Sequence, residues 1–490
     1  MATRSGGPAA PSTLEPRLGV LDAAAIVVSN VIGGGIFFVP QIVAGIAPHP
    51  WALLGVWLLG GLLSFAGAMA YAELAAARPR AGAEYVYLRD AFGRLPAFLT
   101  GWTSFVAGFS GAIAASAVAL AEYLGRFVPA AGDATPLVTL PLPLVPLVVS
   151  RKALVALGAI AALSFVHVRG LGPGRLVQNS LAGLKVSGLL LFVALGLSLG
   201  HGSPANLSTG AGPVTVAAVL LALVPVMFSY SGWNAAAYVA EEVRDPARNV
   251  PRALALGTGA VTVIYLGLNV LFLYATPVGE LSVLRRGLID ATSDRLFPFG
   301  VAGWITAFTI VSIAASISAM TIAGPRVYFA MARDGLFLGK AARVHPRFHS
   351  PALSIVAQAV WSGVLVLSGT LSQLLSYTGF AVVLFSGVAV AGLFVLRRRD
   401  GASERSYSTW GYPVAPAIFV LASAVLVLNE IWSRPGPALA GFGVMAAGVP
   451  VFWWMRADSA RFRAEDQAPR PETRGGVREG LLNTEVIHGE

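Results

Sequence analysis

The chain has 490 residues, of which 56% are hydrophobic and only 12% charged, and its formal net charge is +10. Soluble domains contain about 25% charged residues, so this composition excludes an ordinary soluble protein, and apolar segments of spanning length predict an all-α polytopic membrane protein. Cysteine is absent, which excludes disulfides, thiolate metal sites and cysteine catalysis.

Twelve transmembrane helices are predicted, and a Pro-rich external loop is expected at 129–146. The predicted spans are 18–46 (broken), 51–77, 96–128, 152–169, 174–200, 213–243 (broken), 251–275, 300–333, 352–370, 372–396, 413–432 and 437–456. Because the first and sixth helices are the broken ones, the spacing indicates two inverted five-helix repeats plus two extra helices. The predicted units are a disordered N-terminal tail (1–17), the two repeats (18–200 and 201–396), helices 11 and 12 (397–456) and a mobile C-terminal tail (457–490).

The first break is predicted at Gly33, Gly34 and Gly35. Each glycine inside a helix costs about 1 kcal/mol relative to alanine, so three in a row favour an interruption. A break creates free N–H groups that suit a carboxylate and free carbonyls that suit an ammonium group. Broken-helix transporters bind zwitterions in this way. The alternative is a glycine-lined contact between packed helices.

Lys185 lies near the middle of the fifth predicted span. A charge at that depth is costly and indicates a functional site. The alternative is a structural lysine whose ammonium group is satisfied by backbone carbonyls, and carbonyls freed by a broken helix are suitable partners.

The second break is predicted between Pro225 and Asn234, where proline, small residues and polar side chains interrupt the sixth span. Packing in the core or against lipid is the alternative role for its aromatic residues, Phe228 and Trp233. In the eighth helix, Ser312 and Ser316 share a face, although such serines often bond only to their own helix.

The distribution of Lys and Arg places both termini in the cytoplasm by the positive-inside rule. The segments predicted to lie outside carry only Arg126, Arg151, Lys152, Arg285, Arg286, Arg295 and Arg434. The basic excess is therefore a topology signal, and no nucleic-acid partner is expected. Sequence motifs for ATP hydrolysis, zinc proteases and serine hydrolases are absent, so no enzyme activity, cofactor or metal is expected.

Three motifs resemble one family, the amino acid–polyamine–organocation superfamily of permeases. Its first-helix break, G-[SG]-G-I-F, is matched by Gly33-Gly34-Gly35-Ile36-Phe37. The sixth-helix motif of its L-type amino acid transporter branch is similar to Tyr230-Ser231-Gly232-Trp233-Asn234 with the following Glu241-Glu242. The end of its eighth helix is similar to Gly324-Pro325-Arg326 with Ala332-Arg333-Asp334-Gly335. The likeness covers most of residues 18–456.

The resemblance implies a LeuT-type fold and a set of substrate-binding residues. The amides of Gly34 and Gly35 bind the substrate carboxylate in this scheme, and Gly33 forms the turn. Backbone carbonyls bind the substrate amino group, namely those of Val31, Phe228, Ser229 and Ser231. Phe228 also acts as a gate.

The resemblance also gives Lys185 the place that a sodium ion takes in sodium-dependent members, with Ser316 and Ser318 as its eighth-helix contacts. Ser231 stands where many L-type members have glycine. The implied function is sodium-independent transport of L-amino acids by alternating access, which we expect to be an exchange. Neutral substrates are expected because no acidic residue lies mid-span; Glu122 is near the outer end of the third helix.

Several alternatives remain open from the sequence. One is a proton-coupled amino acid or polyamine carrier, in which the buried lysine titrates. A membrane amino acid sensor or channel on the same scaffold is more remote. The expected location is the plasma (inner) membrane, as a monomer or weak oligomer. Without cysteine, no disulfide-linked ancillary subunit is expected. The sequence does not identify the amino acids transported.

Overall fold

The computed structural model describes residues 14–141, 146–284, 288–297, 302–368, 371–401, 406–433 and 435–467. In this part of the chain, nine helices are long and apolar enough to cross a membrane. They are α3 (Pro50–Ala77), the continuous α5 (Arg94–Thr103), η2 (Ser104–Gly108) and α6 (Phe109–Leu124), then α7 (Arg151–Val168), α8 (Leu171–Leu199), α11 (Pro246–Ala275), α14 (Ala302–Arg333), α16 (Leu371–Asp400), α17 (Val414–Ser433) and α18 (Pro435–Gln467). The chain is therefore an integral multi-pass membrane protein.

Shorter elements lie between and beside these helices. Three are apolar helices: α1 (Val20–Val31), α9 (Val216–Ser229) and α15 (Ala352–Ser368). The others are η1 (Gly35–Phe37), α2 (Val39–Ile46), α4 (Glu84–Phe92), η3 (Pro129–Gly132), η4 (Pro204–Leu207), α10 (Ala235–Tyr238), η5 (Ala240–Glu242), α12 (Val278–Leu281), α13 (Leu288–Leu296) and η6 (Gly339–Ala342). The predicted helix limits agree with these bounds to within a few residues, apart from the C-terminal end of α18.

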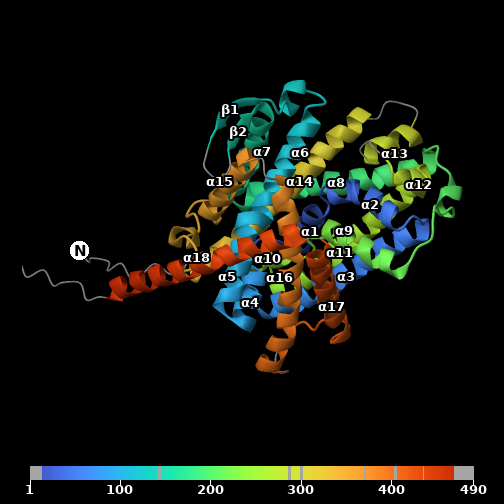
Figure 1. Cartoon of the computed structure of the whole chain (residues 1–490). Coiled ribbons are helices and arrows are strands. Elements are labelled where there is room, and N and C mark those ends of the chain that lie inside the picture. The colour runs from blue at the N-terminus through green and yellow to red at the C-terminus, as the bar shows by residue number, and fades with distance from the viewer. Residues whose placement is uncertain are drawn as a thin grey trace, which may run out of the picture.

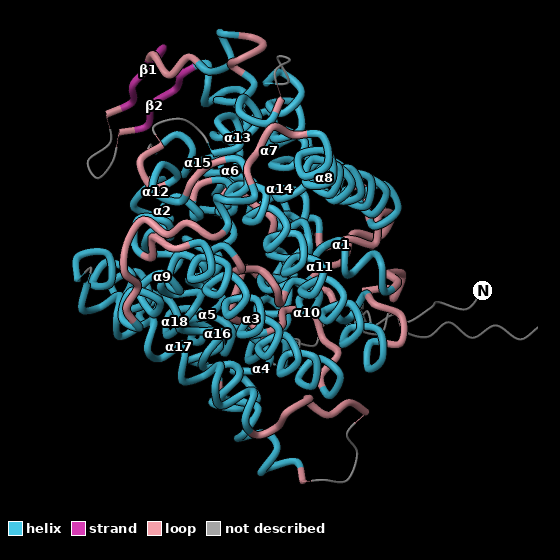
Figure 2. The backbone as a smooth tube through the Cα atoms, turned by 90° about the vertical axis from the view of Figure 1, so that its right-hand side faces the viewer, coloured by secondary structure: helices cyan, strands magenta, loops and turns pink. Residues whose placement is uncertain are grey.

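The predicted external loop at 129–146 contains a β-hairpin, which the sequence analysis missed. Strand β1 (Pro136–Leu140) pairs antiparallel with β2 (Leu147–Ser150), with Leu140 opposite Leu147. A bulge separates Pro136 from Val138, as expected where proline cannot donate to the ladder. Figure 2 shows the hairpin at one edge of the helical body.

Helix α1 lies at the centre of the arrangement, packed against α8, α11 and α14. Figure 1 shows α1 and α14 close together in the middle of the molecule. The other broken segment begins with α9, which packs on α2 and α3. A large buried apolar cluster joins these elements and includes Trp57, whose ring meets that of Tyr265 edge-on at 5.3 Å.

The structure describes part of each predicted tail, namely residues 14–17 and the end of α18. Leu14 is buried, and the Arg17 and Leu18 amides both donate to the Glu242 carbonyl at 2.8 Å. Residues 14–17 therefore pack on the end of the sixth-helix segment, because a buried leucine and paired amides hold them. At the other end, α18 continues past the predicted limit at 456 to Gln467 and projects beyond the helical body (Figure 1). Residues 1–13 and 468–490 lie outside the described residues.

Candidate functional site

The first helix is interrupted where the three glycines stand. Helix α1 ends at Val31, a single 3₁₀ turn covers Gly35–Phe37, and α2 begins at Val39. The Gly33 amide turns back to the Val31 carbonyl at 2.8 Å instead of continuing the helix. Within the described residues, the amides of Gly34 and Gly35 have no backbone acceptor. They are therefore free donors at the start of a new helical turn.

The sixth segment is interrupted after Ser229, where α9 ends. A turn through Gly232, at φ +100°, connects it to the short helix α10. The positive φ is a conformation that glycine adopts at little cost. The Ser231 amide donates to the Phe228 carbonyl at 3.1 Å, whereas no donor to the Ser231 carbonyl is found within the described part of the chain.

The two breaks are in direct contact. A Cβ at Gly35 would lie 2.7 Å from Ser229 Oγ and 3.1 Å from Ser229 Cα, and a Cβ at Gly232 would lie 3.0 Å from Asn30 Nδ2. These distances are shorter than van der Waals contact, so only glycine allows the two backbones to approach so closely. The two breaks therefore lie against each other, at Gly35 with Ser229 and at Gly232 with Asn30.

Part of this junction is accessible. Gly34 is exposed, Phe228 keeps 37% of its surface exposed, and Gly33, Gly35 and Ser231 are half-buried. A Cβ at Gly33 or Gly34 would meet no atom closer than 3.9 Å. Room for a side chain therefore remains at Gly33 and Gly34, and the exposed Phe228 directly precedes Ser229, the residue that lies against Gly35.

Tyr265 of α11 bridges the two breaks, a role that the sequence analysis missed. Its hydroxyl lies 3.0 Å from the Val31 carbonyl and 3.0 Å from the Ser229 carbonyl. The single hydroxyl proton is shared between these two acceptors. The Val31 oxygen also accepts the Gly33 amide, so both of its lone pairs are engaged. A tyrosine hydroxyl buried in an apolar span needs a hydrogen-bond partner. That requirement is the feature of the sequence from which the role of Tyr265 could have been predicted.

Lys185 of α8 is fully buried against the first break. Its Nζ donates to the Ile32 carbonyl at 2.5 Å, to Ser316 Oγ at 2.9 Å and to the Ser29 carbonyl at 3.3 Å. The ammonium group has three protons, and these three acceptors match them. Ser316 also donates to the Ile32 carbonyl at 3.0 Å. Lys185 therefore joins α8, the end of α1 and α14 at one point.

Ser318 does not join this cluster, which corrects the expectation that it shares Lys185 with Ser316. Its hydroxyl lies 2.8 Å from Nε2 of His167 on α7. Two residues along an α-helix correspond to a rotation of about 200°, so Ser316 and Ser318 face opposite sides of α14.

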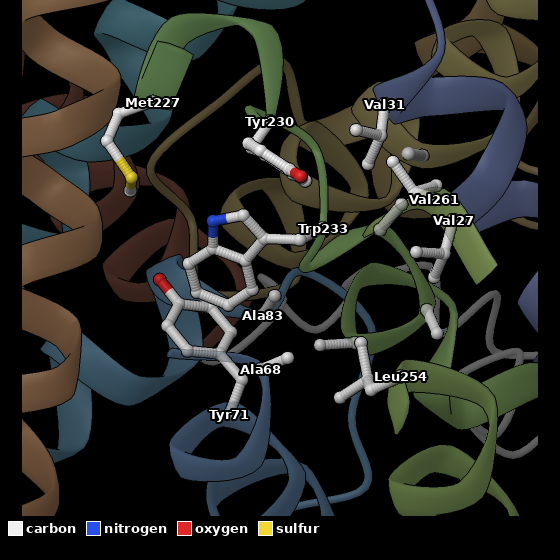
Figure 3. Packing of buried hydrophobic residues seen from close by; sticks show 14 of the residues in the cluster. Val27, Val31, Ala68, Tyr71, Ala83, Met227, Tyr230, Trp233, Leu254 and Val261 are labelled. Atoms are coloured by element: carbon white, nitrogen blue, oxygen red, sulfur yellow. The ribbon is translucent and has the colours of Figure 1, made fainter. Parts of the chain in front are cut away.

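The aromatic residues of the second break are packing residues. Trp233 is 4% exposed and meets the Tyr71 ring at 4.9 Å in an edge-on arrangement, as Figure 3 shows. Tyr230 donates its hydroxyl proton to the Trp57 carbonyl. Their rings fix the turn between α9 and α10 and leave Phe228 as the exposed aromatic residue of this break.

Below the second break, toward the predicted inner face, a buried carboxylate ties α4 to α10. Glu84 accepts from the Tyr71 hydroxyl at 2.8 Å, from Asn234 Nδ2 at 2.6 Å and from the Tyr238 hydroxyl. Burial raises the pKa of Glu84, because no cation offsets the loss of water around its carboxylate. Glu84 was not predicted from the sequence because a glutamate on a short polar helix ordinarily lies in water.

A buried ion pair closes the predicted inner end. Arg326 of α14 forms two parallel hydrogen bonds with Glu242, at 2.7 and 2.8 Å, and both side chains are almost completely buried. The backbone beside Glu242 pairs with the start of the first helix, because Leu18 and Val243 form a parallel bridge. The inner ends of the two broken helices and α14 are thus held together.

Comparisons with known proteins agree on one family. A family model described as amino acid permease matches residues 18–455. The large neutral amino acids transporter small subunit 2 of Mus musculus is 28% identical over 463 residues, covering 92% of this chain and 82% of that protein. The b(0,+)-type amino acid transporter 1 of Mus musculus is 29% identical, with 86% and 84% covered. The Asc-type amino acid transporter 1 of Mus musculus is 27% identical, with 90% and 81% covered.

Proposed function

The chain belongs to the amino acid permease family, and from that premise we propose that it is a sodium-independent transporter of neutral L-amino acids that works as an exchanger. The names of its relatives support the substrate class, since they include large neutral amino acid and Asc-type transporters. The single observation that carries the proposal is the contact between the two helix breaks, with Gly35 lying against Ser229.

In the proposed complex, the substrate carboxylate accepts hydrogen bonds from the amides of Gly34 and Gly35, with Gly33 forming the turn. The positive end of the new helical turn adds electrostatic attraction. The substrate ammonium group donates to carbonyl oxygens of the second break. Ser231 is the best-placed acceptor, because its carbonyl has no donor within the described residues. Ser229 supplies a further carbonyl with a free lone pair, whereas the Phe228 carbonyl already accepts the Tyr230 and Ser231 amides and is a secondary ligand in the proposal.

The Val31 carbonyl is the exception among the proposed ligands. Both of its lone pairs are engaged, by Gly33 and Tyr265. We assign it a conditional role: it receives the substrate ammonium group only when the Tyr265 hydroxyl turns fully to Ser229. The exposed Phe228 ring acts as the gate over the bound substrate.

Lys185 takes the place of a coupling cation in this proposal. Its ammonium group supplies a fixed positive charge where the first helix leaves carbonyls unpaired, so no sodium ion is needed to hold the break. The proposed arrangement comprises twelve transmembrane helices in two inverted five-helix repeats of the LeuT type, followed by two further helices. Both termini are cytoplasmic and the protein resides in the plasma (inner) membrane. No enzyme activity and no covalently linked subunit are proposed.

Alternating access follows from the same contacts. We assign α1, α2, α3, α9, α10 and α11 to a moving bundle, and α6, α7, α8, α14 and α15 to a static scaffold. Opening to the inside breaks the Arg326–Glu242 pair, which links the two bodies. A substrate bound at the breaks satisfies their exposed hydrogen-bond donors and acceptors. It thereby lowers the free energy of the intermediate that is closed to both sides of the membrane. An empty site lacks that compensation, which favours exchange over net uptake.

The experiment is uptake of radiolabelled leucine by the purified protein in liposomes. Uptake should be several-fold faster when the liposomes contain unlabelled leucine than when they are empty, and choline should replace sodium without loss. A pH gradient that drives uptake into empty liposomes would instead indicate a proton-coupled carrier. Leucine binding without flux, or single-channel conductance, would overturn the transporter assignment in favour of a sensor or a channel.

A further inference from the structure

A positively charged cavity of about 340 Å³ opens at the predicted inner face, away from the helix breaks. Its lining comes from three places: the segment before α1, the first turn of α8 and the segment between η5 and α11. The lining residues are Pro16, Arg17, Leu171, Gly172, Arg175 and Arg244. The volume is at the lower end of the range for small-ligand pockets, about 300–1,000 Å³.

Among the residues that the structure describes, three arginines line this cavity and no Asp or Glu does. Arg17 pairs with Glu15, and Arg175 Nη1 lies 3.8 Å from the carboxylate of Asp22, so both keep unused N–H donors. Arg244 makes no ion pair with any residue that the structure describes. The cavity therefore holds an excess of positive charge and of hydrogen-bond donors, a combination that recognises phosphate.

The backbone adds donors of the same kind. Leu171 and Gly172 are the first two residues of α8, a helix of 29 residues whose start has no side-chain cap. Their amides have no acceptor within the helix, and the positive end of its dipole lies at the cavity. Residues 1–13, which precede this segment in the sequence, contain no Asp or Glu to neutralise it. These residues therefore supply no carboxylate to the cavity.

The surroundings favour a lipid as the source of that anion. Leucines along α8 remain exposed, with 69% for Leu176, 55% for Leu184 and 57% for Leu191, as expected for a helix that contacts acyl chains. The cavity lies at the end of this helix that is predicted to face the cytoplasm, where a membrane-spanning helix meets the lipid headgroups. We propose that it binds the phosphate of one anionic phospholipid in the inner leaflet, whose acyl chains run along α8.

The site joins two bodies, which gives the lipid a role in gating. Arg17 and Arg244 lie on segments that pair with each other, since the Arg244 amide donates to the Leu18 carbonyl at 2.9 Å. The remaining donors lie on α8. A bound headgroup therefore links the inner ends of the first and sixth helices to α8 and stabilises the closed inner side. This consequence rests on the proposed function, whereas the binding itself does not.

The test is native mass spectrometry of the delipidated full-length protein titrated with dioleoylphosphatidylglycerol or dioleoylphosphatidylcholine. One phosphatidylglycerol should bind at concentrations where phosphatidylcholine does not. The combined variant Arg17→Gln/Arg175→Gln/Arg244→Gln should weaken that binding at least about tenfold. Arg244→Gln alone breaks no described ion pair and should weaken it about threefold, which keeps the test valid if the combined variant folds poorly.

The matched control removes three exposed arginines from the same predicted face but outside the cavity: Arg248→Gln/Arg252→Gln/Arg343→Gln. It should retain the bound lipid. Equal weakening in the control and the cavity variant would overturn the site in favour of general charge attraction. Thermal stabilisation by millimolar inorganic phosphate but not by phosphatidylglycerol would overturn the lipid assignment. None of these measurements requires transport, so a failure of the proposed function does not affect them.

Discussion

Replacing Lys185 tests whether the first break depends on a fixed cation. The Lys185→Ala variant removes the donor to the Ser29 and Ile32 carbonyls and to Ser316 Oγ. The Ile32 carbonyl keeps one partner, because the Ser316 hydroxyl also donates to it. The Ser29 carbonyl keeps no donor within the described residues, since the Gly33 amide that would serve it in an intact helix turns to Val31 instead.

The magnitude follows from these contacts. A buried carbonyl left without a partner costs about 1–3 kcal/mol, and each hydrogen bond to a charged group contributes about 1.5–3 kcal/mol. If the conformations that contain the ordered break lose about 3 kcal/mol of stabilisation, transport through them should be about a hundredfold slower. The fold itself should persist, because Lys185 is one of many buried contacts around α1.

The assay is exchange of radiolabelled leucine in liposomes, with the amount of folded protein measured by size-exclusion chromatography. Lys185→Met, which keeps most of the side-chain volume, should lose transport as Lys185→Ala does. Lys152→Ala is the matched control, because its partner Glu122 is 70% exposed and surface ion pairs contribute about 0–1 kcal/mol. Exchange at the wild-type rate in folded Lys185→Ala protein would refute the reasoning.

Three further predictions follow from other contacts. Gly35→Ala places a Cβ 3.1 Å from Ser229 Cα, so it should separate the two breaks and reduce leucine exchange at least about tenfold. Glu242→Gln leaves the buried Arg326 without a counterion and should lower the free energy of unfolding by about 3–5 kcal/mol, measured by thermal or denaturant unfolding in detergent. Burial raises the pKa of Glu84, so between the unfolded-state and folded-state pKa values the folded protein binds more protons than the unfolded chain. The free energy of unfolding should therefore fall as the pH rises through that interval. Glu84→Gln should flatten this pH dependence in thermal unfolding profiles, and the variant should be more stable than the wild type at alkaline pH.

Each of these predictions has a control or a contrary outcome. Gly158 on α7 has no neighbouring atom within 4 Å of the position that an added Cβ would take, so Gly158→Ala should leave exchange unchanged. Glu280→Gln removes an exposed pair with Arg295 and should change the unfolding free energy by about 1 kcal/mol or less. If the unfolding temperatures of the wild type and Glu84→Gln depend on pH in the same way, the pKa of Glu84 does not differ between the folded and the unfolded protein.

The transmembrane helices and the break at Gly33–Gly35 were predictable because both depend on local chemistry. Apolar runs of spanning length have few other uses, and three adjacent glycines inside one are costly unless the helix ends there. The contact of Lys185 with the first break was also predictable, since a mid-span charge requires partners and the broken helix offers carbonyls. The choice between Ser316 and Ser318 was not, because it depends on which face of α14 meets α8.

Other features depend on contacts between segments that the sequence does not bring together. Tyr265 lies in an apolar run where an aromatic ring ordinarily packs, and its partners are carbonyls from two other helices. Glu84 begins the short polar helix α4, and only the tertiary structure buries it. The hairpin at Pro136–Leu140 was hidden by its prolines, although Val138 and Thr139 favour strand.

Lys185 and Tyr265 hold carbonyl groups that the two helix breaks leave without backbone partners. Each break leaves more carbonyls than local amides can satisfy, and unpaired buried carbonyls destabilise the protein. Lys185 serves those facing α8 and α14, and Tyr265 serves those of Val31 and Ser229 that face α11. The Ser231 carbonyl is served by neither, and it lies beside the accessible amides of Gly34 and Gly35 in the proposed site. We infer that the placement of Lys185 and Tyr265, rather than the glycines alone, determines where a substrate ammonium group binds. Tyr265→Phe should therefore slow leucine exchange with little loss of folded protein. Unchanged exchange in that variant would contradict the inference.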